Sequence, residues 1–325
     1  MPGFDVPVAL IFFTRPDTLQ KVFEQVRKVK PKELYLIQDG PRENNEQDKE
    51  KILECRKIVE QIDWDCEIHK NYSETNLGCG MRPYTGISWV FENVDRAIIL
   101  EDDCVPAMSF FDYCKEMLER YENDFRVGII SGLNHFGEFD FGGFSYGFVK
   151  SAGIWGWATW KSRWEKYDYS AGNIDNDYIK KCLSYDITPT KAANNRIKAW
   201  INYREAIRKN PKVAYWDNQW SLIRHINSWC SIVPKYNQIS NIGIGNASTH
   251  AKMQLSCMPK KVAGFFFMET KELEFPLKHP DFLIPDREYD KKYYKIIYPP
   301  AITGFISRCY RFLKKKLLNV LKKDN

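Results

Sequence analysis

The stretch Arg96–Asp103 constrains the fold more than any other part of this 325-residue chain. A run of apolar residues follows Arg96 and leads directly into three carboxylates, Glu101, Asp102 and Asp103. A short, continuous apolar run is typical of a buried strand in a parallel sheet. Ligands of open α/β sheets bind beyond the carboxyl ends of such strands. We therefore expect the three acids at the ligand-binding edge of an α/β sheet.

Three adjacent carboxylates repel one another unless a cation shares their site. Mg²⁺ and Mn²⁺ prefer carboxylate and phosphate oxygens as ligands, so a divalent metal that holds an anionic ligand explains the cluster. A solvated acidic turn at the end of a strand explains the same residues. The cluster alone favours neither interpretation.

Apolar runs alternate with amphipathic stretches along the first half of the chain. This alternation predicts a doubly wound α/β fold with right-handed crossovers. We expect strands at 6–13, 33–37, 66–69 and 127–131, besides the one that ends at 103. Helices are expected at 16–29, 48–62, 110–121 and 195–209, and also after Gly80 and from about residue 217. The second half of the chain has a less regular pattern.

The composition is that of an ordinary soluble globular chain, with 44% hydrophobic and 28% charged residues. The nine cysteines have no disulfide-framework, CxxC or Cys/His zinc spacing, which favours free thiols in a reducing cytosol. The first residues lack the basic region of a signal peptide, and no stretch approaches the ~20 apolar residues of a membrane span. The net charge of +6 lies largely at the C-terminus, so no nucleic-acid groove is expected.

Short motifs over residues 6–252 resemble, in order, those of GT-A-fold glycosyltransferases. The pattern is that of family-2-like bacterial enzymes related to the N-acetylglucosaminyltransferase I type. Preserved order is more specific than any single motif. The motifs are Phe13-Thr14-Arg15-Pro16, Gln38-Asp39-Gly40, Asn76-Leu77-Gly78, Ile99-Leu100-Glu101-Asp102-Asp103, Gly156-Trp157-Ala158-Thr159-Trp160, Trp216-Asp217-Asn218-Gln219-Trp220, and Ser240-Asn241-Ile242-Gly243 to Thr249-His250.

The resemblance implies a GT-A (Rossmann-like), mostly parallel sheet flanked by helices. It also implies a metal-dependent inverting transferase that moves a sugar from a nucleotide-diphospho-sugar, with a UDP-sugar favoured, to a hydroxyl acceptor. By the resemblance, Asp103 and His250 would bind the metal, and Glu101 and Asp102 would contact the ribose and the sugar. Imidazole suits Mn²⁺ better than Mg²⁺, so Mn²⁺ is the first choice. A loop histidine that bonds a backbone carbonyl is the alternative for His250.

Four further residues are candidates for binding the nucleotide. The resemblance implies that Phe13 lies against it and that Asp39 contacts the base. Arg15 and Arg82 can offer guanidinium forks to the nucleotide. An ordinary turn residue is a strong alternative for Asp39, which precedes a glycine, and either arginine can equally be a surface cation.

Asp217 is the candidate general base. It lies between Trp216 and Trp220, which would remove water from the carboxylate and raise its pKa toward a useful value. A helix N-cap is the alternative, because aspartate is a preferred capping residue.

Trp155, Gly156 and Trp157 are candidates for the acceptor side. An indole ring can stack on a sugar, and a glycine lets the backbone approach a ligand closely. Four tryptophans fall within residues 155–164, and most of them are expected in the core.

The domain organisation that we expect is one GT-A catalytic domain over residues 1–255. Its nucleotide-sugar half spans about 1–131 and its acceptor half about 132–255. A wrapping extension follows at 256–300, and a tail completes the chain at 301–325.

The tail carries apolar residues at helical spacing among many lysines and arginines. Such a helix suits an anionic membrane surface, and it is too short and too charged to span a bilayer. This predicts a peripheral protein at the cytoplasmic face of the membrane, acting on a glycan or lipid-linked glycan of surface polysaccharide synthesis. Packing on the domain, or pairing in a homo-oligomer, explains the same pattern.

Two other functions compete with a transferase. A sugar-nucleotide pyrophosphorylase would be expected to carry a glycine-rich loop with a basic residue after the first strand, where this chain has Phe13-Thr14-Arg15-Pro16. A non-catalytic carbohydrate-binding or membrane-active protein would leave the acidic cluster, Asp217 and His250 without a role.

Overall fold

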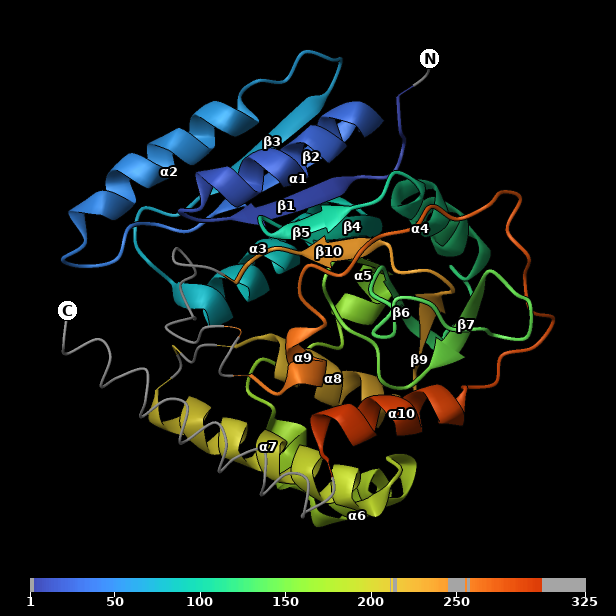
Figure 1. The fold of residues 1–325 in the computed structure, drawn as a ribbon. Coiled ribbons are helices and arrows are strands. Elements are labelled where there is room, and N and C mark those ends of the chain that lie inside the picture. Colours follow the sequence, from blue (N-terminus) through green and yellow to red (C-terminus); the bar gives the residue numbers. More distant parts are fainter. Residues whose placement is uncertain (1–2, 211, 213–214, 245–254, 256–257, 300–325) are drawn as a thin grey trace, which may run out of the picture.

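The computed structural model describes residues 3–210, 212, 215–244, 255 and 258–299. Its centre is an eight-stranded sheet with the strand order β3-β2-β1-β4-β8-β6-β9-β7 (Figure 1). The strands are β1 (Val8–Phe12), β2 (Glu33–Gln38), β3 (Glu67–Tyr72), β4 (Arg96–Glu101), β6 (Val127–Ser131), β7 (Tyr146–Val149), β8 (Trp157–Trp160) and β9 (Cys230–Pro234). A small antiparallel sheet pairs β5 (Cys104–Pro106) with β10 (Ile239–Asn241).

Helices flank the sheet, so the predicted α/β fold class is confirmed. Strands β3, β2, β1 and β4 run parallel to their neighbours, and antiparallel pairs occur in the second half, where β8 joins β4 to β6. The helices are α1 (Pro16–Val29), α2 (Glu46–Val59), α3 (Gly78–Asn93), α4 (Ser109–Arg120), α5 (Lys161–Trp164), α6 (Asp177–Asp186), α7 (Thr190–Lys209), α8 (Asp217–Ile226), α9 (Lys260–Ala263) and α10 (Arg287–Ile297), with a 3₁₀ turn η1 (Gly172–Asp175).

Strands β1, β2 and β4 are buried on both faces, because their alternate residues enter two different cores. Leu10 of β1 and Leu100 of β4 pack in the core that contains residues of α1, α2 and α4. Ile11 and Ile99, the neighbours of these leucines in the same strands, pack in the core that contains residues of α3 and α8. This two-sided burial explains the continuous apolar runs in the sequence.

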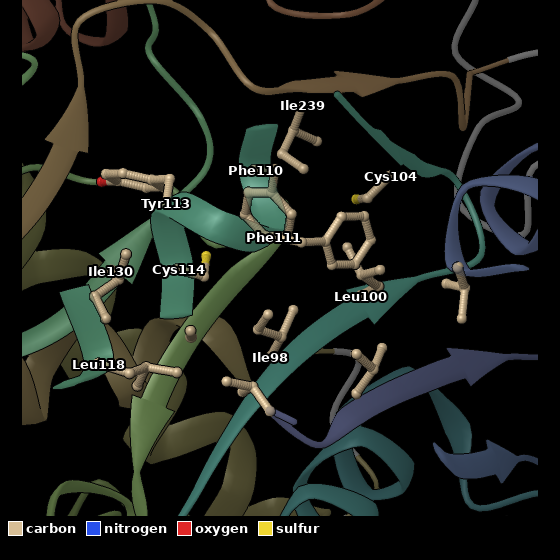
Figure 2. Packing of buried hydrophobic residues seen from close by; sticks show 14 of the residues in the cluster. Ile98, Leu100, Cys104, Phe110, Phe111, Tyr113, Cys114, Leu118, Ile130 and Ile239 are labelled. Carbon is tan, nitrogen blue, oxygen red and sulfur yellow. The ribbon is translucent and has the colours of Figure 1, made fainter. Parts of the chain in front are cut away.

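Figure 2 shows side chains of α4 packed against those of β4, with Phe110 and Phe111 near Leu100. Phe110 and Phe111 of α4 are buried with Leu100 of β4 and Ile239 of β10. The close packing fixes β10 next to the end of β4. The segment that follows the acidic cluster is therefore anchored, although it is short.

A third, smaller core joins helices of the second half of the chain. It is built around Trp200 of α7 and also contains Leu183 of α6, Leu222 of α8 and Tyr294 of α10. Residues beyond 256 contribute to the larger cores as well, for example Leu277 and Tyr289. The proposed boundaries at 131 and 255 stay predictions.

Two predicted features lie outside the described residues, namely His250 and the tail at 301–325. Among the helices that the structure describes, none combines the length and the apolar composition that are needed to cross a membrane.

Candidate active site

A cavity of about 680 Å³ lies at the carboxyl ends of β1 and β4. The strand order places β2 on one side of β1 and β4 on the other, which is the switch point where open α/β sheets bind their ligands. Ile11 pairs with Glu101, and the Asp102 N–H donates to the Ile11 carbonyl at 2.9 Å. Nine of the sequence-predicted site residues line this cavity: Phe13, Arg15, Asp39, Arg82, Glu101, Asp102, Asp103, Trp155 and Asp217.

Arg15 holds two of the three acids. Its guanidinium donates to Asp103 Oδ2 at 2.8 Å and forms an ion pair with Asp102. The Phe13 N–H donates to the other oxygen of Asp102 at 3.2 Å. Burial lowers the pKa of Arg15, but the attraction of the two carboxylates outweighs it and leaves the pKa raised. The positive charge of Arg15 is therefore secure, and it stabilises acids that would otherwise repel one another.

Glu101 differs from the other two acids. Its carboxylate has no hydrogen bond or ion pair to any described residue. Burial, and to a smaller extent repulsion from Asp103 and Asp102, raises the pKa of Glu101 to about 8. Glu101 lines the cavity without a partner among the described residues, so it is available to a ligand.

Two residues that sequence reasoning did not select complete the cluster. Asn241 of β10 places its side-chain nitrogen 3.5 Å from Asp103 Oδ1, and its side-chain oxygen accepts from the Gly243 N–H at 2.9 Å. A Cβ atom on Gly243 would lie 1.9 Å from Asp103 Oδ2 and 3.0 Å from Arg15. A larger residue here would have to displace the Asp103 carboxylate or the Arg15 guanidinium. The Ser240–Gly243 motif contained the signal, but its importance depends on the antiparallel pairing of β10 with β5.

The oxygen atoms at this site fit a divalent metal that is held mainly by the phosphates of a bound substrate. Within the described ranges, no three His, Cys, Asp or Glu side chains are grouped so that they could share a metal ion. Mg²⁺-type sites often use only one or two carboxylates, and substrate phosphates and water supply the other ligands. Asp103 lines the cavity, and Glu101 has no partner in the part of the chain that the structure describes, so together they meet that smaller requirement. A metal on Asp103 would have to share this carboxylate with Arg15 or displace Arg15 from it.

Asp39 and Arg82 already bond to the protein. Asp39 accepts hydrogen bonds from the N–H groups of Gly40, Leu77 and Gly78 at 2.8–2.9 Å. It thereby ties the end of β2 to the start of α3, which is a structural role that differs from that of a simple turn residue. Burial raises the pKa of Asp39, and these N–H groups oppose the increase.

Arg82 is likewise buried. Its Nε donates to the Gln38 carbonyl at 3.1 Å and its Nη2 donates to Asn71 Oδ1 at 2.8 Å. It is therefore not the surface cation that was the alternative. Both Arg82 and Asp39 also line the cavity, and their contact with a nucleotide stays a prediction.

Asp217 does not cap helix α8, which was the alternative to a role as general base. It is the first residue of α8, and Trp216 occupies the N-cap position. The carboxylate accepts from Asn218 Nδ2 at 3.1 Å. Burial raises the pKa of Asp217, while attraction to Arg196 opposes the increase. A raised pKa is the property that a general base needs near neutral pH.

The three acceptor-side candidates have different environments. Trp155 lines the cavity. The prediction for Trp157 is wrong, because its side chain is completely buried (0% exposed) and stacks on Trp216 at 5.8 Å between ring centroids. Gly156 has φ +58°, and a Cβ atom there would lie 2.3 Å from Ile239 Cδ1. The close approach at Gly156 is therefore to the core and not to a ligand.

Comparisons with known proteins give only distant matches. No family model matches the sequence, and no curated protein matches it either. Among solved structures, a UDP-glucose pyrophosphorylase complexed with UDP-glucose has 9% identity and a TM-score of 0.36, over 72% of this chain and 91% of that chain. Apo UDP-glucose pyrophosphorylase has 9% identity and a TM-score of 0.35, over 73% and 93%.

A third match is 4-diphosphocytidyl-2C-methyl-D-erythritol synthase from Anaerococcus prevotii. It has 11% identity and a TM-score of 0.31, over 63% of this chain and 96% of that chain. At these values the likeness concerns the arrangement of parts of the fold and gives no information on the reaction. None of the matches is sequence evidence for a glycosyltransferase family.

Proposed function

We propose that this chain is a glycosyltransferase that uses a nucleotide-diphospho-sugar. The observation that carries the proposal is that Asp217 lines the same cavity as Glu101, Asp102 and Asp103. One wall then offers groups for the donor, and another offers a buried carboxylate for the acceptor. A protein that only binds carbohydrate has no use for such a carboxylate beside the acidic cluster.

In this proposal Asp217 takes the proton of the acceptor hydroxyl as its oxygen attacks the anomeric carbon. The new bond to the acceptor oxygen forms while the bond to the diphosphate oxygen breaks, so the anomeric configuration inverts. Trp155, at the cavity wall, orients the acceptor sugar. Arg15 orients the diphosphate and carries part of its charge. A divalent metal at Asp103 and His250, with Mn²⁺ preferred over Mg²⁺, would neutralise the leaving diphosphate.

A sugar-nucleotide pyrophosphorylase is the second candidate, because the acidic cluster beside Arg15 suits a nucleotide and a divalent metal in that reaction as well. The turn Phe13–Arg15 after β1 lacks the glycine-rich loop that such an enzyme is expected to carry. The two candidates consume different substrates. A pyrophosphorylase joins a nucleoside triphosphate to a sugar 1-phosphate and releases pyrophosphate.

A substrate panel tests the proposal. Thermal unfolding is measured with UDP- and GDP-sugars, with and without Mn²⁺, because a ligand at 100 times its Kd stabilises by about 2.7 kcal/mol. We expect a nucleotide sugar to raise the melting temperature and to be hydrolysed slowly when no acceptor is present. Pyrophosphate release from a nucleoside triphosphate and a sugar 1-phosphate, without any reaction of nucleotide sugars, would establish the second candidate instead.

The proposed acceptor is a glycan or lipid-linked glycan of surface polysaccharide synthesis, at the cytoplasmic face of the membrane. The support comes from the sequence of the tail, which lies outside the described residues. Each basic residue near anionic lipid contributes about 1 kcal/mol. Replacing Lys314, Lys315 and Lys316 by glutamine should thus weaken binding to anionic liposomes by about 100-fold.

Flotation at low salt measures this prediction. The matched control replaces three lysines of the described part, Lys21, Lys49 and Lys57, which are exposed on α1 and α2. The wild type and the control should float, and the tail variant should stay at the bottom. If all three proteins float equally or none floats, the tail does not bind the membrane and the lipid-linked acceptor loses its support.

A further inference from the structure

A second cavity, of about 210 Å³, adjoins the first. Ile154, Trp155 and Asp217 line both cavities, so the two meet at the carboxylate assigned as the base. The volume is below the roughly 300–1,000 Å³ of pockets that hold a drug-sized ligand. The second cavity is therefore suited to one small substituent of a bound molecule.

The charged residues around this cavity are mostly basic. Lys150, Arg196 and Arg224 line it, and Asp217 is the one acidic lining residue in the part of the chain that the structure describes. Lys150 already has partners, because its Nζ donates to the Ser228 carbonyl at 2.7 Å and lies 3.9 Å from an Asp186 oxygen. Neither arginine forms an ion pair with a described carboxylate.

Arg224 is buried (6% exposed) without a carboxylate. Its Nη1 and Nη2 both donate to the Ala152 carbonyl at 3.2 Å, and Nη1 also donates to Ser231 Oγ at 3.3 Å. Its Nε is buried and bonds to no described atom. Burial, followed by repulsion from Arg196, lowers the pKa of Arg224 to about 10, so this guanidinium is charged at neutral pH.

Arg196 has a similar environment on α7. Its Nη2 donates to Ser221 Oγ, and its guanidinium carbon lies 4.9 Å from the centroid of the Trp200 ring. Its Nε is also buried without a partner among the described residues. Asp217 attracts it across the junction of the two cavities but forms no ion pair with it.

The two histidines of the cavity add no further positive charge. Burial, with repulsion from Arg224, lowers the pKa of His135 to about 3. Burial also lowers the pKa of His225 to about 4, although Asp186 opposes this decrease. Both rings are neutral near pH 7. Asp217 is therefore the one described carboxylate of the cavity that faces the two guanidinium groups, and it forms an ion pair with neither of them.

A buried charge without a partner is costly, and proteins that retain one usually pair it with a ligand or a metal. Two adjacent guanidinium groups match the oxygens of a carboxylate or a phosphate. We propose that the second cavity binds such an oxyanion, carried by the acceptor close to the hydroxyl that reacts. The assignment to the acceptor rests on the proposed function, whereas the anion site rests on the two arginines alone.

The test measures binding of glucuronate, glucose 6-phosphate and glucose to the full chain by calorimetry. Arg196→Gln and Arg224→Gln each remove one charge. Arg208→Gln is the matched control, because Arg208 lies on the same helix as Arg196 but is exposed and paired with Asp175 at 2.8 Å. We expect at least one anionic sugar to bind, with about 10- to 100-fold lower affinity in each of the first two variants and unchanged affinity in the control.

The outcomes distinguish a carboxylate from a phosphate as the bound anion, and they test the anion site separately from the proposed function. Binding of glucuronate alone assigns a sugar acid, and binding of glucose 6-phosphate alone assigns a phosphorylated acceptor. The site is refuted if neither anion binds, if glucose binds as tightly as the anions, or if both arginine variants keep wild-type affinity. A UDP titration of every variant reports the first cavity separately. If the protein binds an anionic sugar but does not bind UDP, the proposed function is refuted and the anion site is still supported.

The unliganded variants give a second readout that does not depend on finding the correct anion. Since an unpaired buried charge destabilises the fold, Arg224→Gln should not lower the melting temperature of the protein without added anion. Inorganic phosphate should raise the melting temperature of the wild type and of Arg208→Gln, but not that of Arg196→Gln or Arg224→Gln. A large loss of stability in both arginine variants, without any effect of phosphate on the wild type, would show that the arginines serve folding alone.

Discussion

Replacing Asp217 by asparagine should lower the turnover number by about 10²–10⁴-fold and leave binding of the nucleotide sugar unchanged. Asparagine keeps the size of the side chain and its hydrogen-bonding ability, but it cannot accept the proton of the acceptor hydroxyl. Asp217 is not the capping residue of α8, so the substitution should change the free energy of unfolding by little. Steady-state kinetics with the true acceptor and calorimetry with the donor measure the two effects.

The pH profile of the Asp217→Asn variant separates chemistry from structure. Burial raises the pKa of Asp217, so the wild-type rate should fall as the pH decreases through that raised pKa, where the base becomes protonated. The variant should lack this acidic limb. Asp290→Asn is a useful control, because Asp290 is also buried with a raised pKa, caused by burial, but bonds to Lys150 and Ser151 instead of lining either cavity. Near wild-type turnover of Asp217→Asn would exclude the proposed base.

The acidic cluster was predictable from the sequence, because its three acids directly follow the apolar residues of a single strand, β4. The apolar residues of β4 require burial on both faces, and the acids then have to lie at the carboxyl end of the strand. Arg15 follows β1, and the parallel pairing of β1 with β4 brings it to the same edge. The strand order β3-β2-β1-β4 places β1 next to β4, so Arg15 lies beside Asp102 and Asp103.

The parts that were missed depend on long-range pairing. Strands β8 and β9 are short, and β8 lies antiparallel to β4, which no local periodicity indicates. Trp157 illustrates the difficulty, because alternation alone does not show which tryptophan of a cluster faces the core. Gly243 and the pair Arg196–Arg224 were missed for a similar reason: their partners come from other elements, and no spacing in the sequence connects them.

Removing divalent cations should weaken the binding of UDP by about ten-fold or more, because the diphosphate then faces the carboxylates of Asp102 and Asp103 with only Arg15 between them. In the ligand-free structure Arg15 is bonded to Asp102 and Asp103. A cation on Asp103 would compete with Arg15 for that carboxylate and release one arm of the guanidinium for the diphosphate. The cation and the arginine should therefore act together, and calorimetry of UDP binding in EDTA and in Mn²⁺ measures this coupling.

Two substitutions locate the effect on the acidic cluster. Asp103→Asn should abolish the difference between EDTA and Mn²⁺, because an amide is a much weaker ligand for a divalent cation than a carboxylate. Asp112→Asn is the matched control, since Asp112 is an exposed aspartate of α4 outside the cavity. It should retain the full difference. Equal affinity of the wild type for UDP in EDTA and in Mn²⁺ would contradict the metal proposal, and Arg15 would then be the cation that serves the diphosphate.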